Sequence, residues 1–371
     1  MRSFDRLIGL LSEIPDPRRA EGKLYKLPYV LLFSILATMT GGNSYRSIET
    51  FITVHRCRLN AAFGLKWKRA PAHTAIRHIL QRLDPKHLEQ IFRRHAAGLL
   101  DGASGPEQRT VALDGKVLRG SFDNFRDRKP AQLLHAFDTK FGLILAHIDI
   151  DEKSNEIPAA QKLLGELHVA HSTITVDALH CQKILRGCRA SPGTSDYPTE
   201  GQSAHFDAKC RNCDCQHPTS SDTSVTKARN RRETRTVDIF SATRAVANTE
   251  WKHLIKGIVR VTREVLHRSA KTGLWSSAPE VAYYVAGFVG SANHAGIAIR
   301  SHWHIENTLH YTRDVTFQED QSRIRCNPGV FARIRSFGYN ILRCNQARTF
   351  SQDRYAAALA GRDALSKWSV S

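Results

Sequence analysis

The sequence has no long hydrophobic run. Its longest apolar stretch extends from Tyr29 to Thr40, which is far shorter than the roughly 20 residues that a membrane-spanning helix needs. The residues after Met1 also lack the basic segment followed by an apolar core that marks a signal peptide. We therefore expect neither an integral membrane protein nor a secreted one.

Cysteine and acidic residues are also scarce. The eight cysteines do not show the paired spacing of a disulfide framework, so we expect a reducing, cytosolic setting. The 35 Asp and Glu residues face 54 Lys and Arg residues, which leaves a net charge of +19. Residues 1–100 hold 17 of these basic residues and 7 of the acidic ones. Such an excess indicates a polyanionic partner, and nucleic acid is the favoured one.

Apolar residues at helical spacing predict a small helical domain over residues 1–100. The predicted helices cover residues 4–11, 28–39, 44–55, 73–83 and 85–100. The basic, aromatic segment Lys66–Arg69 joins two of them. This pattern is compatible with a helix-turn-helix DNA reader and, equally, with a helical cap that carries a solvated basic loop.

After the linker-like residues 101–106, the pattern changes to strands. The order β-β-β-α-β predicts a mixed sheet in an α+β or α/β fold. Its expected elements are the strands 110–113, 132–137, 142–150 and 172–176 and the helix 158–167. Further strands are predicted at 234–240, 255–265 and 281–288, and helices at 294–314 and 330–345.

Two of these predicted strands stop at an aspartate, Asp114 and Asp177. Carboxylates at neighbouring strand ends can bind hard divalent cations through oxygen, as Mg²⁺ requires. The basic, glycine-rich segment after Asp114 adds Lys116 and Arg119 as candidate phosphate contacts. For either aspartate taken alone, a turn-forming or capping role is the better interpretation.

A third carboxylate, Glu306, lies far downstream in a predicted helix. At helical spacing it shares one face with His302, His310 and Arg313. Such a set is suited to gripping a metal ion and a scissile phosphate. The alternative is the polar outer stripe of an amphipathic helix.

Several segments resemble the signature blocks of DDE transposases of bacterial insertion sequences, in the branch that includes the H-repeat-associated proteins. These blocks are Asp114–Ser121, Val176–Gln182 and His302–His310. Pro15–Arg19 and Ser44–Ile48 resemble the transposase-associated domain of that branch. The resemblance covers nearly the whole chain, and its blocks occur in the expected order.

The resemblance implies a DNA-binding domain over residues 1–100 and a catalytic domain over residues 107–371. The catalytic domain would have an RNase H-like mixed sheet, with a strand-rich insertion at about 185–290. The implied substrate is double-stranded DNA, both the terminal inverted repeats of the element and the target. The protein would act at the nucleoid in the bacterial cytoplasm, as a homodimer on DNA.

The resemblance also implies the site residues. Asp114, Asp177 and Glu306 would hold Mg²⁺, which Mn²⁺ could replace, for DNA cleavage and strand transfer. His302, His310 and Arg313 would position DNA phosphates, in addition to Lys116 and Arg119. Ser121 and Cys181, which lie near the two aspartates, would not serve as nucleophiles because the reaction needs none from the protein.

One stretch departs from the family. Within Leu185–His217, only Leu185 and Phe206 are Val, Ile, Leu, Met or Phe, so we expect disorder. Compensating frameshifts would leave such a peptide, and the chain would then be a damaged copy. A zinc knuckle is the alternative, with the candidate ligands Cys210, Cys213, Cys215 and His217.

Two other functions stay open at this point. The chain could be a catalytically inactive DNA-binding remnant or repressor, in which the basic N-terminal domain is the working part. It could also be another RNase H-like DNA nuclease, such as a resolvase. Metal-dependent cleavage separates either enzyme from the repressor.

Overall fold

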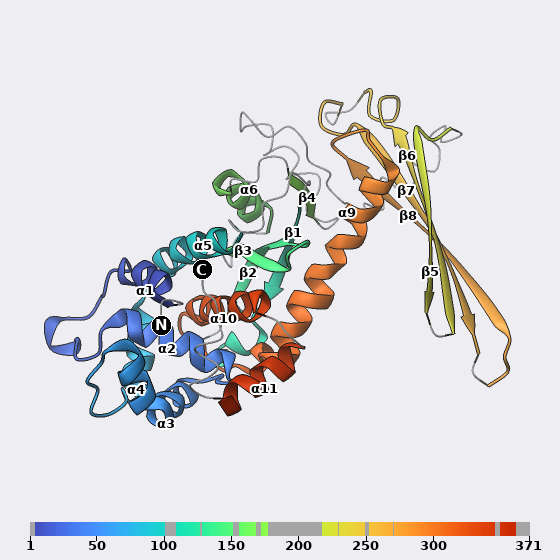
Figure 1. The fold of residues 1–371 in the computed structure, drawn as a ribbon. Helices are drawn as coiled ribbons and strands as arrows, with labels where there is room; N and C mark the ends of the chain where they lie inside the picture. The colour runs from blue at the N-terminus through green and yellow to red at the C-terminus, as the bar shows by residue number, and fades with distance from the viewer. Residues whose placement is uncertain are drawn as a thin grey trace. The chain divides into compact units, whose positions relative to one another are not determined.

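The fold was analysed in a computed structural model. It describes residues 4–100, 109–126, 128–150, 156–167, 172–176, 217–228, 230–248, 252–269, 271–345 and 349–360. Asp177, Cys181 and the stretch 185–216, with the three cysteines proposed as zinc ligands, lie outside these residues. The chain divides into two compact units, and Figure 1 labels their helices and strands. The first unit consists of residues 1–106, 115–155 and 306–371, and the second of residues 107–114 and 156–305.

The N-terminal half of the first unit is helical, as predicted. Its helices are α1 (Asp5–Ser12), α2 (Leu27–Met39), α3 (Tyr45–Phe63), α4 (His73–Arg82) and α5 (Pro85–Leu100). The apolar run in α2 explains its position, because nearly all of its side chains are buried.

Local capping fixes the start and the end of α3. The Ser44 hydroxyl accepts a hydrogen bond from the Ser47 backbone N–H, and the Ser47 hydroxyl accepts one from the Ser44 backbone N–H. These bonds satisfy donors that the first turn of a helix leaves free. Gly64 ends the helix with a φ of 63°, a left-handed conformation that glycine adopts without steric cost.

The same unit continues with C-terminal helices. Helix α10 (Pro328–Cys344) packs against α2 and α5, and α11 (Phe350–Ala360) packs against α10. Gly338 permits the close approach of α10 to α2, since a Cβ atom there would lie 3.0 Å from both Met39 and Thr38. The N-terminal helices therefore share their core with the C-terminal part of the chain. The domain boundaries read from the sequence stay a prediction.

A mixed four-stranded sheet has the strand order β3-β2-β1-β4. Its strands are β1 (Arg109–Val117), β2 (Gln132–Asp138), β3 (Leu143–Ile150) and β4 (Ser172–Val176). Strands β2 and β3 are antiparallel, whereas β1 and β4 are parallel. Helix α6 (Glu156–Glu166) precedes β4, as predicted. Strand β1 continues three residues past Asp114, so the prediction that it stops at the aspartate is wrong.

The second unit also contains an antiparallel sheet of four strands in sequence order. They are β5 (Ser220–Ala228), β6 (Arg231–Ser241), β7 (Gly257–Arg268) and β8 (Trp275–Ala286). The last three confirm strands predicted for the insertion. Val237, Ile239, Val259 and Val261 pack against helix α9 (Ala292–His304), which follows the sheet.

The prediction of a mixed α/β protein with a helical N-terminal region is therefore confirmed, and its strands form two separate sheets. None of the helices in the described ranges is long and apolar enough to cross a membrane.

Candidate active site

The register of β1 and β4 relates the two predicted aspartates. Leu113 of β1 is paired with Val176 of β4, and the two strands run parallel. Asp114 directly follows Leu113, and its side chain is half-buried. Asp177 is the next residue after Val176 in the chain, although it lies outside the described residues. The sheet thus pairs Leu113 with Val176, the two residues that directly precede these aspartates in the sequence.

Helix α9 is attached to β4 by two contacts between side chains. The Thr175 hydroxyl lies 2.9 Å from Nδ1 of His302, and the Thr173 hydroxyl lies 3.0 Å from Nε2 of His294. His302 is 7% exposed, and burial lowers the pKa of His294. The His294 contact lies in the first turn of α9, and the His302 contact fixes its last turn beside the end of β4, four residues before Glu306.

The helix changes its geometry at the third carboxylate. After His304 the α-helix gives way to the π-helical turns η5 (Ile305–His310) and η6 (Thr312–Thr316). Glu306 is exposed, whereas Arg313 is completely buried. The prediction that the polar residues of this segment line one face is therefore wrong, because π-helical turns break the 3.6-residue period on which it depended. Such turns are frequent at functional sites.

Asp114 belongs to the second compact unit and Glu306 to the first. Among the described residues, no group of three His, Cys, Asp or Glu side chains is placed to hold a metal ion. Since Asp177 is not among them, the metal site stays a prediction. Its donor set nevertheless fits Mg²⁺, because all three predicted ligands are carboxylates.

Lys116 and Arg119 differ in their surroundings. Lys116 is 6% exposed, and its ammonium group donates a hydrogen bond to the Asp314 carboxylate. Burial raises the pKa of Asp314, although this hydrogen bond opposes the effect. The Arg119 side chain is 79% exposed, with its Nε 3.6 Å from the Asp320 carboxylate. Arg119 is thus the more accessible of the two for an external phosphate.

Arg313 is the most completely bonded cation described. Its Nε and one terminal nitrogen donate to the Glu319 carboxylate, both at 2.7 Å. Its remaining donors contact the Ser336 hydroxyl at 2.7 Å, Nε2 of His135 at 3.0 Å and the Ala332 carbonyl at 3.1 Å. With all donors engaged and no exposure, Arg313 does not reach an external phosphate in this structure. The predicted phosphate role is replaced by a structural one, which joins η6 to β2 and α10.

Glu319 is the centre of this buried charge cluster. Burial alone would raise its pKa, but the charges of Arg313 and Arg335 lower it to about 2. His135 lies against the cluster, and burial together with the Arg313 charge keeps the pKa of His135 well below its usual range.

A second buried cluster joins α5, β3 and α10. Glu89 accepts a bond from the His147 backbone at 2.7 Å, contacts Nδ1 of His147 at 2.9 Å and accepts from Arg333 at 2.8 Å. Burial disfavours the charged form of Glu89, but His147 and Arg333 outweigh it and hold its pKa below the ordinary range. Neither cluster was predicted. The only sequence signal is charged residues within apolar helical patterns.

The basic loop after α3 is anchored by its aromatic residue. The Trp67 ring packs against Tyr25 at 4.9 Å and Phe33 at 5.3 Å between centroids. Its backbone is held by the Asn60 side chain. Lys66, Lys68 and Arg69 remain exposed, which leaves their charges available to a polyanion.

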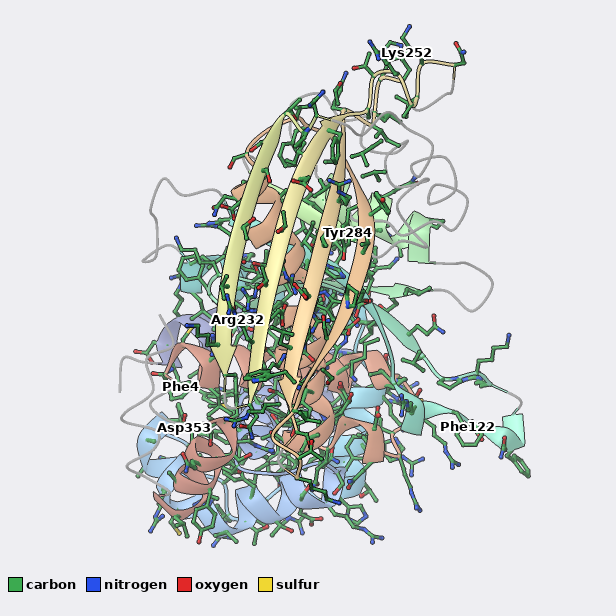
Figure 2. The ribbon with its side chains drawn as sticks, turned by 90° about the vertical axis from the view of Figure 1, so that its right-hand side faces the viewer. Phe4, Phe122, Arg232, Lys252, Tyr284 and Asp353 are labelled. Atoms are coloured by element: carbon green, nitrogen blue, oxygen red, sulfur yellow. The ribbon has the colours of Figure 1, made fainter. Side chains whose placement is uncertain are left out.

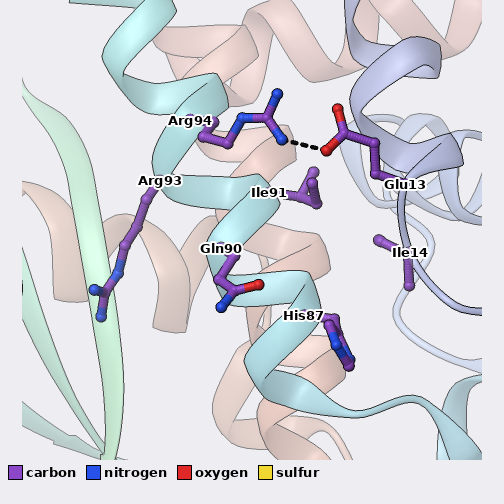
Figure 3. A pocket seen from close by; sticks show the side chains of 7 residues that line it. All are labelled: Glu13, Ile14, His87, Gln90, Ile91, Arg93 and Arg94. Carbon is purple, nitrogen blue, oxygen red and sulfur yellow. Dashed lines mark hydrogen bonds and ion pairs between the residues drawn. The ribbon is translucent and has the colours of Figure 1, made fainter.

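A surface pocket of about 360 Å³ lies between α5 and the end of α1 (Figure 3). Arg94 forms an ion pair with Glu13 at one side of it. None of the predicted site residues lines this pocket, so it is unrelated to the proposed chemistry.

Comparison with known proteins identifies the family. Residues 105–340 match the family described as "Transposase DDE domain", and residues 8–96 match its associated region, "DDE_Tnp_1-associated". The chain belongs to the DDE transposase family. This confirms the resemblance found in the sequence.

Relatives of this DDE transposase are found in Escherichia coli K12. YbfL is 31% identical over 91% of this chain and 90% of its own length. The "H repeat-associated putative transposase YhhI" is 30% identical, with the same coverage. A solved piggyBac transposase synaptic complex with hairpin DNA gives a TM-score of 0.40 at 10% identity, covering 97% of this chain and 79% of that chain. A TM-score of this size does not establish a common fold.

Proposed function

We propose that this DDE transposase cleaves double-stranded DNA at the terminal inverted repeats of its insertion sequence and joins the freed ends to target DNA. Asp114, Asp177 and Glu306 are the proposed metal ligands. The observation that carries the proposal is the parallel pairing of β1 with β4, in which Leu113 lies opposite Val176. Two of the proposed ligands directly follow these paired residues.

The proposed fold of the catalytic region is RNase H-like. The strand order β3-β2-β1-β4, with β2 and β3 antiparallel and β1 and β4 parallel, supports it. Helix α9 would deliver Glu306, because His302 attaches its last turn to Thr175 of β4.

The three carboxylates would act by binding Mg²⁺, or Mn²⁺ in its place, through oxygen. When bound, the metal would polarise the scissile phosphodiester and activate a water or a DNA 3′-hydroxyl. Asp114 and Asp177 would contribute their carboxylates from adjacent strands, and Glu306 would contribute the third carboxylate.

We assign the phosphate contacts among the candidate residues according to how exposed their side chains are. Arg119 is the proposed contact nearest to Asp114 in the sequence, since its side chain is largely exposed. Lys116 is held by Asp314 and His302 by Thr175, so both are proposed to support the site. His310 is half-buried and stays a candidate contact, while Arg313 is removed from the set.

DNA binding outside the active site is assigned to the exposed cations of the loop Lys66–Arg69. The protein would bind DNA as a homodimer and would be found with its substrate at the nucleoid.

One observation favours a second function, that of a DNA-binding remnant without catalysis. The stretch Leu185–His217 is poor in apolar residues, and it directly follows the segment that contains Asp177.

End cleavage by the full chain tests the proposal. Labelled DNA that carries the ends of the element is incubated with the protein in Mg²⁺ and, separately, in EDTA. We expect nicking at the ends in Mg²⁺ alone, and none from a Glu306→Gln variant that binds DNA normally. Binding without cleavage under all metal conditions would support the remnant, and metal-dependent cleavage without strand transfer would support a resolvase-like nuclease.

A further inference from the structure

The two hairpin turns of the sheet β5–β8 lie at the same end of that sheet. One turn joins β5 to β6 and the other joins β7 to β8. They are linked by a hydrogen bond of 2.9 Å from the Arg268 backbone N–H to the Asn230 carbonyl. We call the described residues of this region, 225–228, 230–235, 263–269 and 271–281, the hairpin end. Figure 2 shows Arg232 towards this end and Lys252 at the other end of the sheet.

The two faces of the hairpin end differ in charge balance. Opposed residues of an antiparallel pair share a face, and successive residues alternate between faces. One face carries Arg231, Arg235 and Arg263, and all three form ion pairs with Glu233. Arg235 and Arg263 are directly opposed, but the carboxylate between them compensates for their repulsion.

The other face has cations without such compensation. Lys227 is directly opposed to Arg232, and like charges in opposed positions destabilise a sheet. Neither side chain has an ion pair among the residues that the structure describes. Arg268 extends the same face, and its Nε donates to the Gly273 carbonyl at 3.2 Å. We call the face formed by Lys227, Arg232, Arg268 and Trp275 the basic face.

Exposed apolar groups lie beside these cations. Trp275 is opposed to Arg268 in the register and is 54% exposed. Val225 and Val281 share the face and are 48% and 51% exposed. Glu264, an acidic residue on this part of the face, accepts a hydrogen bond from Ser277. A pair of opposed cations on the same face as an exposed indole is a local conflict that folding alone does not explain.

We propose that the basic face binds an unpaired DNA strand. Lys227, Arg232 and Arg268 would contact successive phosphates, and the Trp275 indole would stack on a base. Single strands are bound by this combination of cations and aromatic rings, since every base offers a π-face. A protein partner would also use the indole, since Trp is enriched at protein interfaces, but it would have to supply acidic groups opposite the cations, whereas every nucleotide of a DNA strand offers both a phosphate and a base. The inference rests on the proposed function in taking DNA as the ligand.

The test measures binding of a labelled single-stranded oligonucleotide and of the same sequence as a duplex, by anisotropy with the full chain at several salt concentrations. The variants are Arg232→Glu and, as a control with the same charge change at the other end of the sheet, Lys252→Glu. We expect Arg232→Glu to weaken single-strand binding about tenfold and to lower the salt slope, by about 0.7 for each phosphate that the variant no longer neutralises. Lys252→Glu should change neither.

Trp275 is tested by Trp275→Ala and Trp275→Phe, with Leu274→Ala as the control at the neighbouring exposed position. We expect Trp275→Ala to weaken single-strand binding by about fivefold or more, and Trp275→Phe to restore most of it. Equal effects of Arg232→Glu and Lys252→Glu, or weakening confined to the duplex, would overturn the inference. If the wild type still cleaves element ends in that case, the proposed function stands and only the basic face is wrong.

Discussion

Replacing Glu319 by Gln tests the buried charge cluster that holds the segment after Glu306. Glu319 is 2% exposed and receives two bonds of 2.7 Å from Arg313. The amide would keep the size of the side chain but remove the negative charge between two buried guanidinium groups. Arg313 and Arg335 would then lie uncompensated in the core.

The loss of unfolding free energy expected for Glu319→Gln can be worked out in two ways. The fall of the Glu319 pKa from 4.5 to about 2 corresponds to about 3 kcal/mol of preference for the ionised form in the folded state. Breaking a buried ion pair by removing one partner typically costs about 3–5 kcal/mol. We therefore expect Glu319→Gln to lower the free energy of unfolding by about 3 kcal/mol or more.

A matched control separates burial from charge. Glu280 pairs with Arg263 at 3.2 Å but is 67% exposed, so Glu280→Gln should cost less than about 1 kcal/mol. The assay is urea unfolding of both variants and the wild type at pH 7, compared by midpoint and slope. Equal destabilisation of the two variants would refute the claim that Glu319 compensates buried charge.

Three further predictions concern acid stability, packing and DNA affinity. Burial lowers the pKa of His95 to about 4 and also lowers those of His135 and His147, so the unfolded state binds more protons below pH 6.5. The contribution of these histidines to the free energy of unfolding should be full above that pH. It should fall on acidification, by up to about 1.4 kcal/mol per pH unit for each histidine. A melting temperature that stays constant between pH 7 and pH 5 would contradict this. Gly120→Ala should destabilise the protein in thermal melts and reduce end cleavage, because its Cβ would lie 2.0 Å from the Ser322 carbonyl oxygen; wild-type values for both would disprove the close approach. Replacing the three cations of the loop Lys66–Arg69 by Ser should weaken duplex binding and reduce its salt slope, by about 0.9 for each phosphate that the loop no longer neutralises; an unchanged slope would exclude this loop as a DNA-binding element.

The elements with clear periodicity could be predicted from the sequence. The apolar run of α2 and the alternating strands β2 and β3 follow the helical and strand periods, because one buried face dictates the pattern. Strand β5 was not predicted. Its Ser- and Thr-rich sequence lies at a sheet edge and is mostly exposed, so it carries no apolar alternation.

The candidate site was predictable only in part. The apolar segments before Asp114 and Asp177 already indicated neighbouring strands, and the pairing of Leu113 with Val176 agrees with that, although β1 continues past Asp114. The structural role of Arg313 could not be predicted from the sequence. Its partner Glu319 follows a π-helical turn, and no periodic pattern in the sequence indicates such a turn. Long-range pairs such as Glu89 with Arg333 depend on the tertiary fold, and a single sequence does not encode them locally.

The central claim is that Asp114, Asp177 and Glu306 form one metal-binding unit. The most direct test is the rate of Mg²⁺-dependent end cleavage for Asp114→Asn, Asp177→Asn, Glu306→Gln and the double variant Asp114→Asn with Glu306→Gln, with DNA affinity measured in parallel. We predict that each single change abolishes cleavage while DNA binding is kept, and that the double variant is no worse than either single one, since a site that lacks one ligand no longer has its geometry. Wild-type cleavage by Glu306→Gln, or effects that multiply in the double variant, would contradict the account.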